Sequence, residues 1–85
     1  MRKVAASRVY ISNEEFYNNH VVELLNSAVV NHYPLVAEQA MTEWLGGAIV
    51  LKSDENGETN AIHYSNFDFV NHCPTSISVV NLLVE

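Results

Sequence analysis

The fold class is decided by residues 20–35, which read HVVELLNSAVVNHYPL. As an extended hairpin, this stretch divides into residues 20–25 and 28–35 around Asn26-Ser27. A pair of adjacent valines lies on each side of that centre, Val21-Val22 before it and Val29-Val30 after it. Asparagine also tolerates the positive φ that a two-residue hairpin turn requires. The pattern therefore favours two neighbouring strands.

The alternative is a single helix over residues 13–33, which would give an α+β fold. Its apolar face would consist of Tyr17, Val21, Leu24, Leu25 and Ala28. That spacing suits a helix, so periodicity alone does not decide between the two. However, the stretch is rich in asparagine and valine, which are poor helix formers. We therefore expect the hairpin.

The remaining sequence predicts further strands and one short helix. Residues 36–45 are rich in helix formers and are followed by Gly46-Gly47, which would cap the helix; a helical turn or loop is the alternative there. Other strands are expected at residues 2–11, 48–51, 59–64 and 76–84, with an Asn56-Gly57 hairpin turn and an irregular covering loop at 65–75. The prediction is one small globular domain over residues 1–85, mostly β. Its five or six antiparallel strands would form a small sandwich or open barrel.

The charge balance excludes two classes of partner. The chain has four basic and ten acidic residues, a net charge of −6. A nucleic-acid binder needs clustered lysine and arginine, and an anionic membrane surface would repel the carboxylates. No signal segment opens the chain, and no apolar run approaches the roughly 20 residues that span a bilayer. The single cysteine precludes an intramolecular disulfide. These features predict a cytoplasmic protein.

Four histidines and one cysteine are the candidate ligands for a zinc ion. They are His20, His32, His63, His72 and Cys73. Zinc would need three or four of them to converge, and no pair has the spacing that places two ligands on one face of a strand or helix. We therefore predict surface or hydrogen-bonded histidines, a buried Cys73, and no cofactor. No constellation typical of an enzyme is present either.

The last predicted strand indicates self-association. Residues 76–84 are apolar on both faces, so the strand is expected to be central in the sheet or covered by a second subunit, since an exposed apolar edge invites aggregation. The candidate interface residues are Trp44, Ile77, Val79, Val80, Leu82 and Val84. The main hypothesis is a non-enzymatic interaction or structural module that forms a homodimer.

Two other functions remain open. One is a metal-binding protein that uses the histidines and Cys73. The other is a small-ligand-binding protein whose pocket would be lined by Tyr10, Tyr17, Tyr33, Tyr64 and Trp44. An apolar cavity of about 300 Å³ or more would be needed for that role.

Residues 3–51 also resemble a known family. The segments ASRVYI (6–11), VVE (21–23), VV (29–30) and LGGAIVL (45–51) are similar to the small β-sandwich domain of metal-dependent amidohydrolases. In those enzymes the glycine-apolar strand leads to a His-x-His pair of metal ligands and a catalytic barrel. This chain has neither, so the resemblance implies a related β-sandwich architecture and no catalytic residue. In general style the chain also resembles small proteins of gut bacteria, which implies no activity.

Overall fold

The decisive stretch folds as a hairpin. The computed structural model describes residues 1–12, 14–37 and 41–85. Strands β2 (Phe16–Leu25) and β3 (Ala28–Pro34) pair antiparallel around a turn in which Asn26 has a φ of 57°. The hairpin prediction is confirmed, and the alternative helix over residues 13–33 is wrong. The left-handed conformation of Asn26 is the one that the turn requires and that asparagine tolerates.

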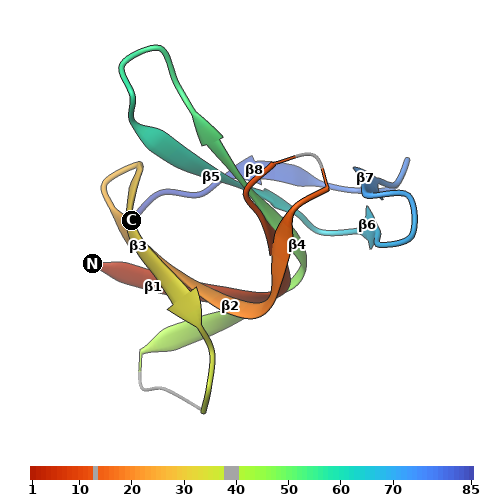
Figure 1. Ribbon diagram of the computed structural model, residues 1–85, viewed down its shortest axis with the longest axis horizontal. Coiled ribbons are helices and arrows are strands. Elements are labelled where there is room, and N and C mark those ends of the chain that lie inside the picture. Colours follow the sequence, from red (N-terminus) through yellow and green to blue (C-terminus); the bar gives the residue numbers. More distant parts are fainter. Residues whose placement is uncertain (13, 38–40) are drawn as a thin grey trace.

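Six strands form one sheet in the order β3-β2-β1-β4-β5-β8 (Figure 1). The other members are β1 (Arg2–Tyr10), β4 (Thr42–Ser53), β5 (Thr59–Tyr64) and β8 (Val80–Leu82), and a separate two-stranded sheet contains β6 (Phe67–Asp68) and β7 (Cys73–Pro74). The mostly-β prediction is confirmed, but the expectation of purely antiparallel pairing is wrong. The pairing of β1 with β4 is parallel, because the chain leaves β3 at one edge and returns on the far side of β1.

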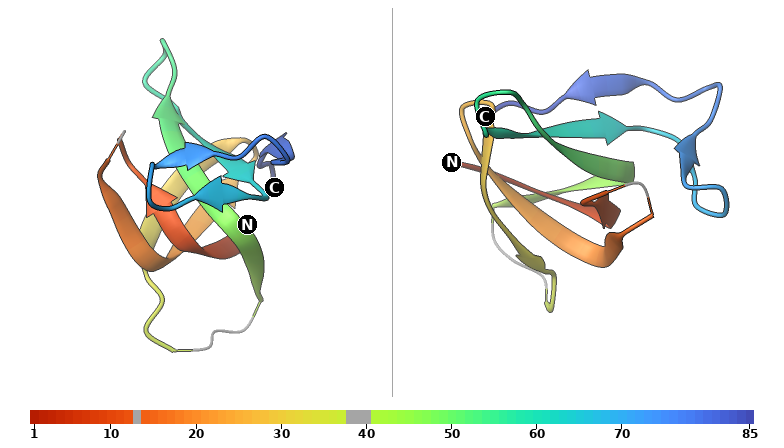
Figure 2. Two further views of the ribbon diagram at one scale, coloured as in Figure 1. Left: turned by 90° about the vertical axis from the view of Figure 1, so that its right-hand side faces the viewer. Right: turned by 45° about the horizontal axis from the view of Figure 1, so that its top comes forward.

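The large sheet curls around its core (Figure 2). Strands β3 and β5 are not neighbours in the sheet, yet they contact each other across the curl, which remains an open sheet. The buried aliphatic cluster comprises Val4, Ala6, Val9, Val22, Leu24, Ile49, Ala61 and Leu83. On β2 the core residues Val22 and Leu24 alternate, whereas on β1 the spacing widens from two residues (Val4, Ala6) to three (Val9), where the register with β4 shifts.

The predicted helix at residues 36–45 is not formed. Residues 42–45 belong to β4 and lie beside β1, residues 36–37 and 41 have no helical structure, and residues 38–40 lie outside the described part. Pairing with the central strand therefore overrides local helix propensity. Gly46 and Gly47 lie inside β4 rather than at a helix end, and Gly47 has a φ of 76° where the register between β1 and β4 shifts.

The C-terminal third differs most from expectation. The Asn56-Gly57 turn joins β4 and β5 as predicted. Residues 65–75 contain the short β6–β7 pair, whereas residues 76–84 contribute only the three-residue β8. The strand was expected to be either central in the sheet or covered by a second subunit; β8 lies at the edge, so the first of these alternatives is wrong. No helix in the described residues is long and apolar enough to cross a membrane.

Candidate functional site

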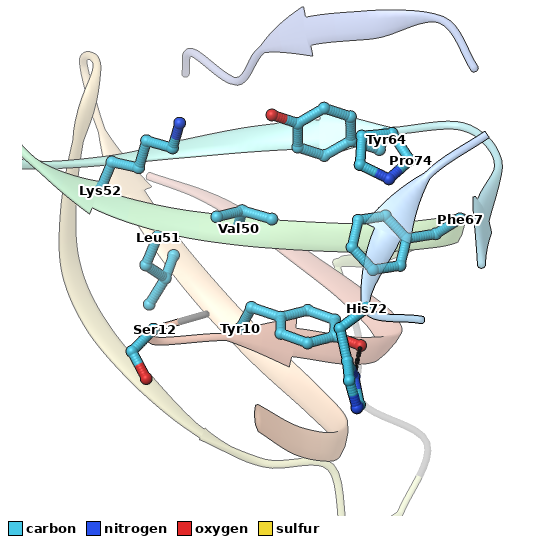
Figure 3. A pocket seen from close by; sticks show the side chains of 9 residues that line it. All are labelled: Tyr10, Ser12, Val50, Leu51, Lys52, Tyr64, Phe67, His72 and Pro74. Carbon is cyan, nitrogen blue, oxygen red and sulfur yellow. Dashed lines mark hydrogen bonds between the residues drawn. The ribbon is translucent and has the colours of Figure 1, made fainter. Parts of the chain in front are cut away.

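A cavity of about 300 Å³ lies against the face of the sheet that points away from the aliphatic core (Figure 3). Its lining consists of Tyr10, Ser12, Val50, Leu51, Lys52, Tyr64, Phe67, His72 and Pro74. Ser12, Lys52 and Pro74 are exposed and form the rim, while Tyr10 is buried. We refer to this cavity as the aromatic pocket.

Register explains why the pocket residues meet. Tyr10 on β1 lies beside Val50 on β4, and Val50 lies beside Ile62 on β5. Because paired residues share a face and side chains alternate along a strand, Tyr10, Val50, Lys52 and Tyr64 project on the same side. The opposite side carries the core residues.

The segment that contains β6 and β7 covers one end of this face. The Phe67 ring lies 5.0 Å from the Tyr10 ring and 5.8 Å from the Tyr64 ring, between centroids. Its turn is held by Asp68, whose Oδ1 accepts hydrogen bonds from the backbone N–H groups of Val70 and Asn71. These bonds, with a further one from the Asn71 side chain as the largest contribution, hold the pKa of Asp68 below its ordinary value.

A chain of hydrogen bonds runs beneath the pocket. Arg8 donates from one guanidinium nitrogen to the Tyr10 hydroxyl at 3.1 Å and to the carbonyl of Phe69 at 2.9 Å. The Tyr10 hydroxyl lies 3.0 Å from Nδ1 of His72. Because the Tyr10 oxygen already accepts from Arg8, its own proton is available to donate to His72. The bond orients the phenol ring that forms one wall.

The Arg8 guanidinium is held between two aromatic rings. Its central carbon lies 4.0 Å from the centroid of the Phe16 ring and 4.6 Å from that of Phe69. Such cation–π contacts contribute roughly 0.5–2 kcal/mol each, depending on exposure. Arg8 thereby ties the covering segment to β1 and β2 and keeps a positive charge next to the pocket.

The four basic residues divide into two groups. Arg2 pairs with Glu43 at 2.7 Å, and Lys3 lies 3.8 Å from Glu23. Arg8 and Lys52 form no ion pair with any carboxylate in the described part of the chain. Lys52 lies in the rim of the aromatic pocket, whereas Arg8 lies outside its lining and donates to the hydroxyl of Tyr10, which is part of it. Lys52 is therefore the one basic residue of the pocket lining, and no described carboxylate pairs with it.

The histidines do not gather at one place. His20 and His32 meet, with Nε2 of His20 2.9 Å from Nδ1 of His32, and Tyr17 stacks on His20 at 4.5 Å between ring centroids. His20 is buried, and its Nδ1 has no hydrogen-bond partner among the described residues. Burial, followed by the neighbouring His32, lowers the pKa of His20. The neutral form of the His20 ring is therefore favoured.

The other predicted ligands lie elsewhere. His63 contacts the carbonyl of Gly46, His72 bonds to Tyr10, and Cys73 is exposed. The prediction of a buried Cys73 is wrong, because β7 lies in the small outer sheet. Among the described residues, no group of three or more His, Cys, Asp or Glu side chains is placed to hold a metal ion.

Of the five aromatic residues expected to line a pocket, the structure brings Tyr10 and Tyr64 together. Tyr17 stacks on His20, Tyr33 donates to Glu23, and Trp44 is 54% exposed on the first half of β4. Sequence reasoning missed Lys52, Phe67 and His72 as pocket residues. The segment that carries Phe67 was expected only as an irregular covering loop over residues 65–75.

Five of the six predicted interface residues lie on or beside β8. Ile77, Val79, Val80, Leu82 and Val84 are between 46% and 73% exposed. Trp44 lies apart from them, on a portion of β4 that does not pair with β5. Five exposed aliphatic residues therefore lie within residues 77–84 at this edge of the sheet, and Trp44 lies elsewhere.

Comparisons with protein-family models, curated proteins and solved structures found no match to this chain.

Proposed function

We propose that this chain is a non-enzymatic interaction module that self-associates through the outer edge of β8. The observation that supports the proposal is the exposure of apolar residues along an unpaired sheet edge. β8 pairs with β5 on one side only, and no strand of the described chain covers its other side. An edge of this kind is a ready template for pairing with another strand.

The backbone of β8 presents free hydrogen-bonding groups to solvent. The Val79 carbonyl accepts from Ser65, and the Leu83 N–H donates to Ala61, so both of these groups point toward β5 or its extension. Backbone groups alternate in direction along an antiparallel strand. The N–H and C=O groups of Val80 and Leu82 therefore point outward, where a partner strand would bind them.

A second copy of the chain is the partner that fits this edge. Residues 69–84 contain no Lys, Arg, Asp or Glu, although the whole chain carries a net charge of −6. Two copies repel each other over most of their surface, and this uncharged edge is where that repulsion is weakest. Pairing of the edge with itself about a two-fold axis gives each strand an identical partner. The resulting sheet would be continuous through both protomers.

The molar mass in solution tests the proposal. We expect light scattering during gel filtration to give twice the chain mass at about 1 mM protein, falling toward one chain mass on dilution. Leu82→Lys should give a monomer, because it places a charge at the centre of the edge. Val36→Lys is the matched control: Val36 is 88% exposed and lies outside β8.

Amide hydrogen exchange provides a second measurement that needs no variant. In the dimer, the amides of Val80 and Leu82 should be protected at high concentration and should lose protection on dilution. A monomeric wild-type protein at about 1 mM, or exchange at these two amides that is independent of concentration, would refute self-association by this edge.

A further inference from the structure

We propose that the aromatic pocket binds a small carboxylate attached to a single aromatic ring. This binding activity is separate from self-association, since the pocket lies between β1, β4, β5 and the β6–β7 segment. The inference rests on the size of the cavity, the identity of its walls, and the position of two cations that have no described carboxylate partner.

The size of the pocket suits one ring with a small substituent. Its volume of about 300 Å³ is at the lower end of the range for ligand sites. An apolar cavity of roughly 150 Å³ accommodates benzene, so this pocket has room for one ring and a carboxylate but not for a nucleotide. The exposed rim at Ser12, Lys52 and Pro74 gives a ligand access.

The walls favour an aromatic body. The Tyr10, Tyr64 and Phe67 rings surround the space, and Val50 lies on the strand between Tyr10 and Tyr64 (Figure 3). The Tyr10 ring is fixed by its bond to His72 and by contact with Phe16 at 5.2 Å between centroids. A flat ring is stabilised by stacked or edge contacts with such walls. A simple inorganic anion would leave them uncovered.

The rim favours a carboxylate. Lys52 projects from β4 on the same side as Val50, and in Figure 3 the Tyr64 hydroxyl points in its direction. Within the described residues, neither the Lys52 ammonium nor the Tyr64 hydroxyl has a hydrogen-bond or ion-pair partner. Both are donors, so a carboxylate oxygen at the mouth of the pocket would satisfy them together.

Arg8 adds selectivity for negative charge. Its guanidinium lies behind the Tyr10 wall, with Phe16 and Phe69 on its faces and with no described carboxylate to neutralise it. Charges near low-dielectric walls act over longer distances than charges in water. A cationic ligand with the same ring would meet two like charges, so the pocket should discriminate by sign.

Titration with benzoate, followed by two-dimensional amide NMR, tests this inference. We expect saturable shifts at Tyr10, Val50, Tyr64 and Phe67, with a dissociation constant of about 1–10 mM, as for a ligand of this size. Benzylamine has the same ring and the opposite charge, and inorganic phosphate has charge without a ring. Neither should produce saturable shifts at these residues.

Matched lysine variants identify the charge that matters. Lys52→Gln should weaken benzoate binding about fivefold, whereas Lys3→Gln, which changes the net charge equally but removes a lysine beside Glu23, should leave it unchanged. Tyr64→Phe keeps the ring and should weaken binding by about twofold or more. Equal effects of the two lysine variants, binding of benzylamine as tight as that of benzoate, or an absence of saturable shifts would each overturn the proposal.

Discussion

Replacing Gly47 by alanine should strongly destabilise the folded state, whereas the same change at the adjacent Gly46 should not. Gly47 lies in β4 with a φ of 76°, and a Cβ added there would lie 2.0 Å from the backbone oxygen of Tyr64. It would also lie 2.8 Å and 2.9 Å from the carbonyl carbon and oxygen of Ser65. These are backbone atoms, so no side-chain rotation relieves the contact.

The free-energy cost of Gly47→Ala is the sum of two terms. A left-handed backbone costs a non-glycine residue about 1–2 kcal/mol. Relieving the contact requires a shift of about 1 Å in β5 at Tyr64, which is paired with Ala48, and overpacking of this kind costs roughly 1–3 kcal/mol. The total is about 2–5 kcal/mol. A chain of this length has a free energy of unfolding of roughly 4–13 kcal/mol, so the loss is a large fraction.

Urea unfolding followed by circular dichroism measures the effect. With a slope of about 1–1.5 kcal/mol per molar urea, a loss of about 2–5 kcal/mol in Gly47→Ala should lower the midpoint by roughly 1–5 M. For Gly46→Ala no atom lies within 4 Å of the added Cβ, and the midpoint should stay the same or rise slightly. Midpoints for the two variants that agree within about 0.3 M would refute the reasoning.

Two further predictions concern charged and titratable side chains. Arg8→Lys should lower the free energy of unfolding by about 1–2 kcal/mol, because lysine cannot stack between Phe16 and Phe69 while also bonding to Tyr10. The control is Arg2→Lys, which changes an exposed ion pair with Glu43 and should lower the free energy of unfolding by less than about 1 kcal/mol in the same urea assay. Equal losses of free energy in the two variants would contradict the role given to Arg8. The pKa of His20 is lower in the folded state than in the unfolded state, so the chain takes up a proton when it unfolds below about pH 6.5. The free energy of unfolding should therefore fall as the pH drops from 7.5 to 5.5, by at most about 1.4 kcal/mol per pH unit. Thermal melting across this range should show a smaller pH dependence in His20→Gln, and an identical dependence in both proteins would exclude His20 as its source.

The hairpins were predictable because their determinants are local. Asn26-Ser27 and Asn56-Gly57 each lie between apolar runs, and turn chemistry alone specifies that the flanking strands pair. The parallel pairing of β1 with β4 was not predictable, because it joins segments distant in sequence. Residues 42–45 have acceptable helix propensity and become strand only because the side of β1 opposite β2 needs a partner.

The candidate site was predictable only in part, for a similar reason. Tyr10 and Tyr64 were expected to line a pocket, and their facing positions follow from strand alternation. The other wall, Phe67, depends on a turn held by Asp68 and on a left-handed conformation at His72, where φ is 56°. Residues 65–75 were expected to cover the sheet, but positive φ is uncommon outside glycine, so the left-handed turn that brings Phe67 against Tyr10 was not predictable.

The exposed position of β8 follows from the order of strands in the sheet, which the amino-acid pattern does not predict. A strand apolar on both faces predicts burial, but only Leu83 in this segment is buried, at 5% exposure. Its neighbours flank the edge of the sheet instead. The same apolar composition that suggested a central strand therefore marks a surface, and the distinction depends on strand order rather than on residue type.

The parallel pairing of β1 with β4 has a consequence for the order of folding. The first three strands, β1, β2 and β3, are consecutive in sequence and adjacent in the sheet, so they can pair as neighbours. β4 pairs with β1, although β2 and β3 lie between these two strands in the sequence. Non-local contacts of this type are slow to form. Whenever β4 is undocked, the central strand has one open side along Val4, Ala5 and Ala6, all of them apolar. Conditions that slow the pairing of β4 with β1 should therefore promote aggregation, and the aggregates should form at β1 and not at β3 or β8, the edges of the native sheet.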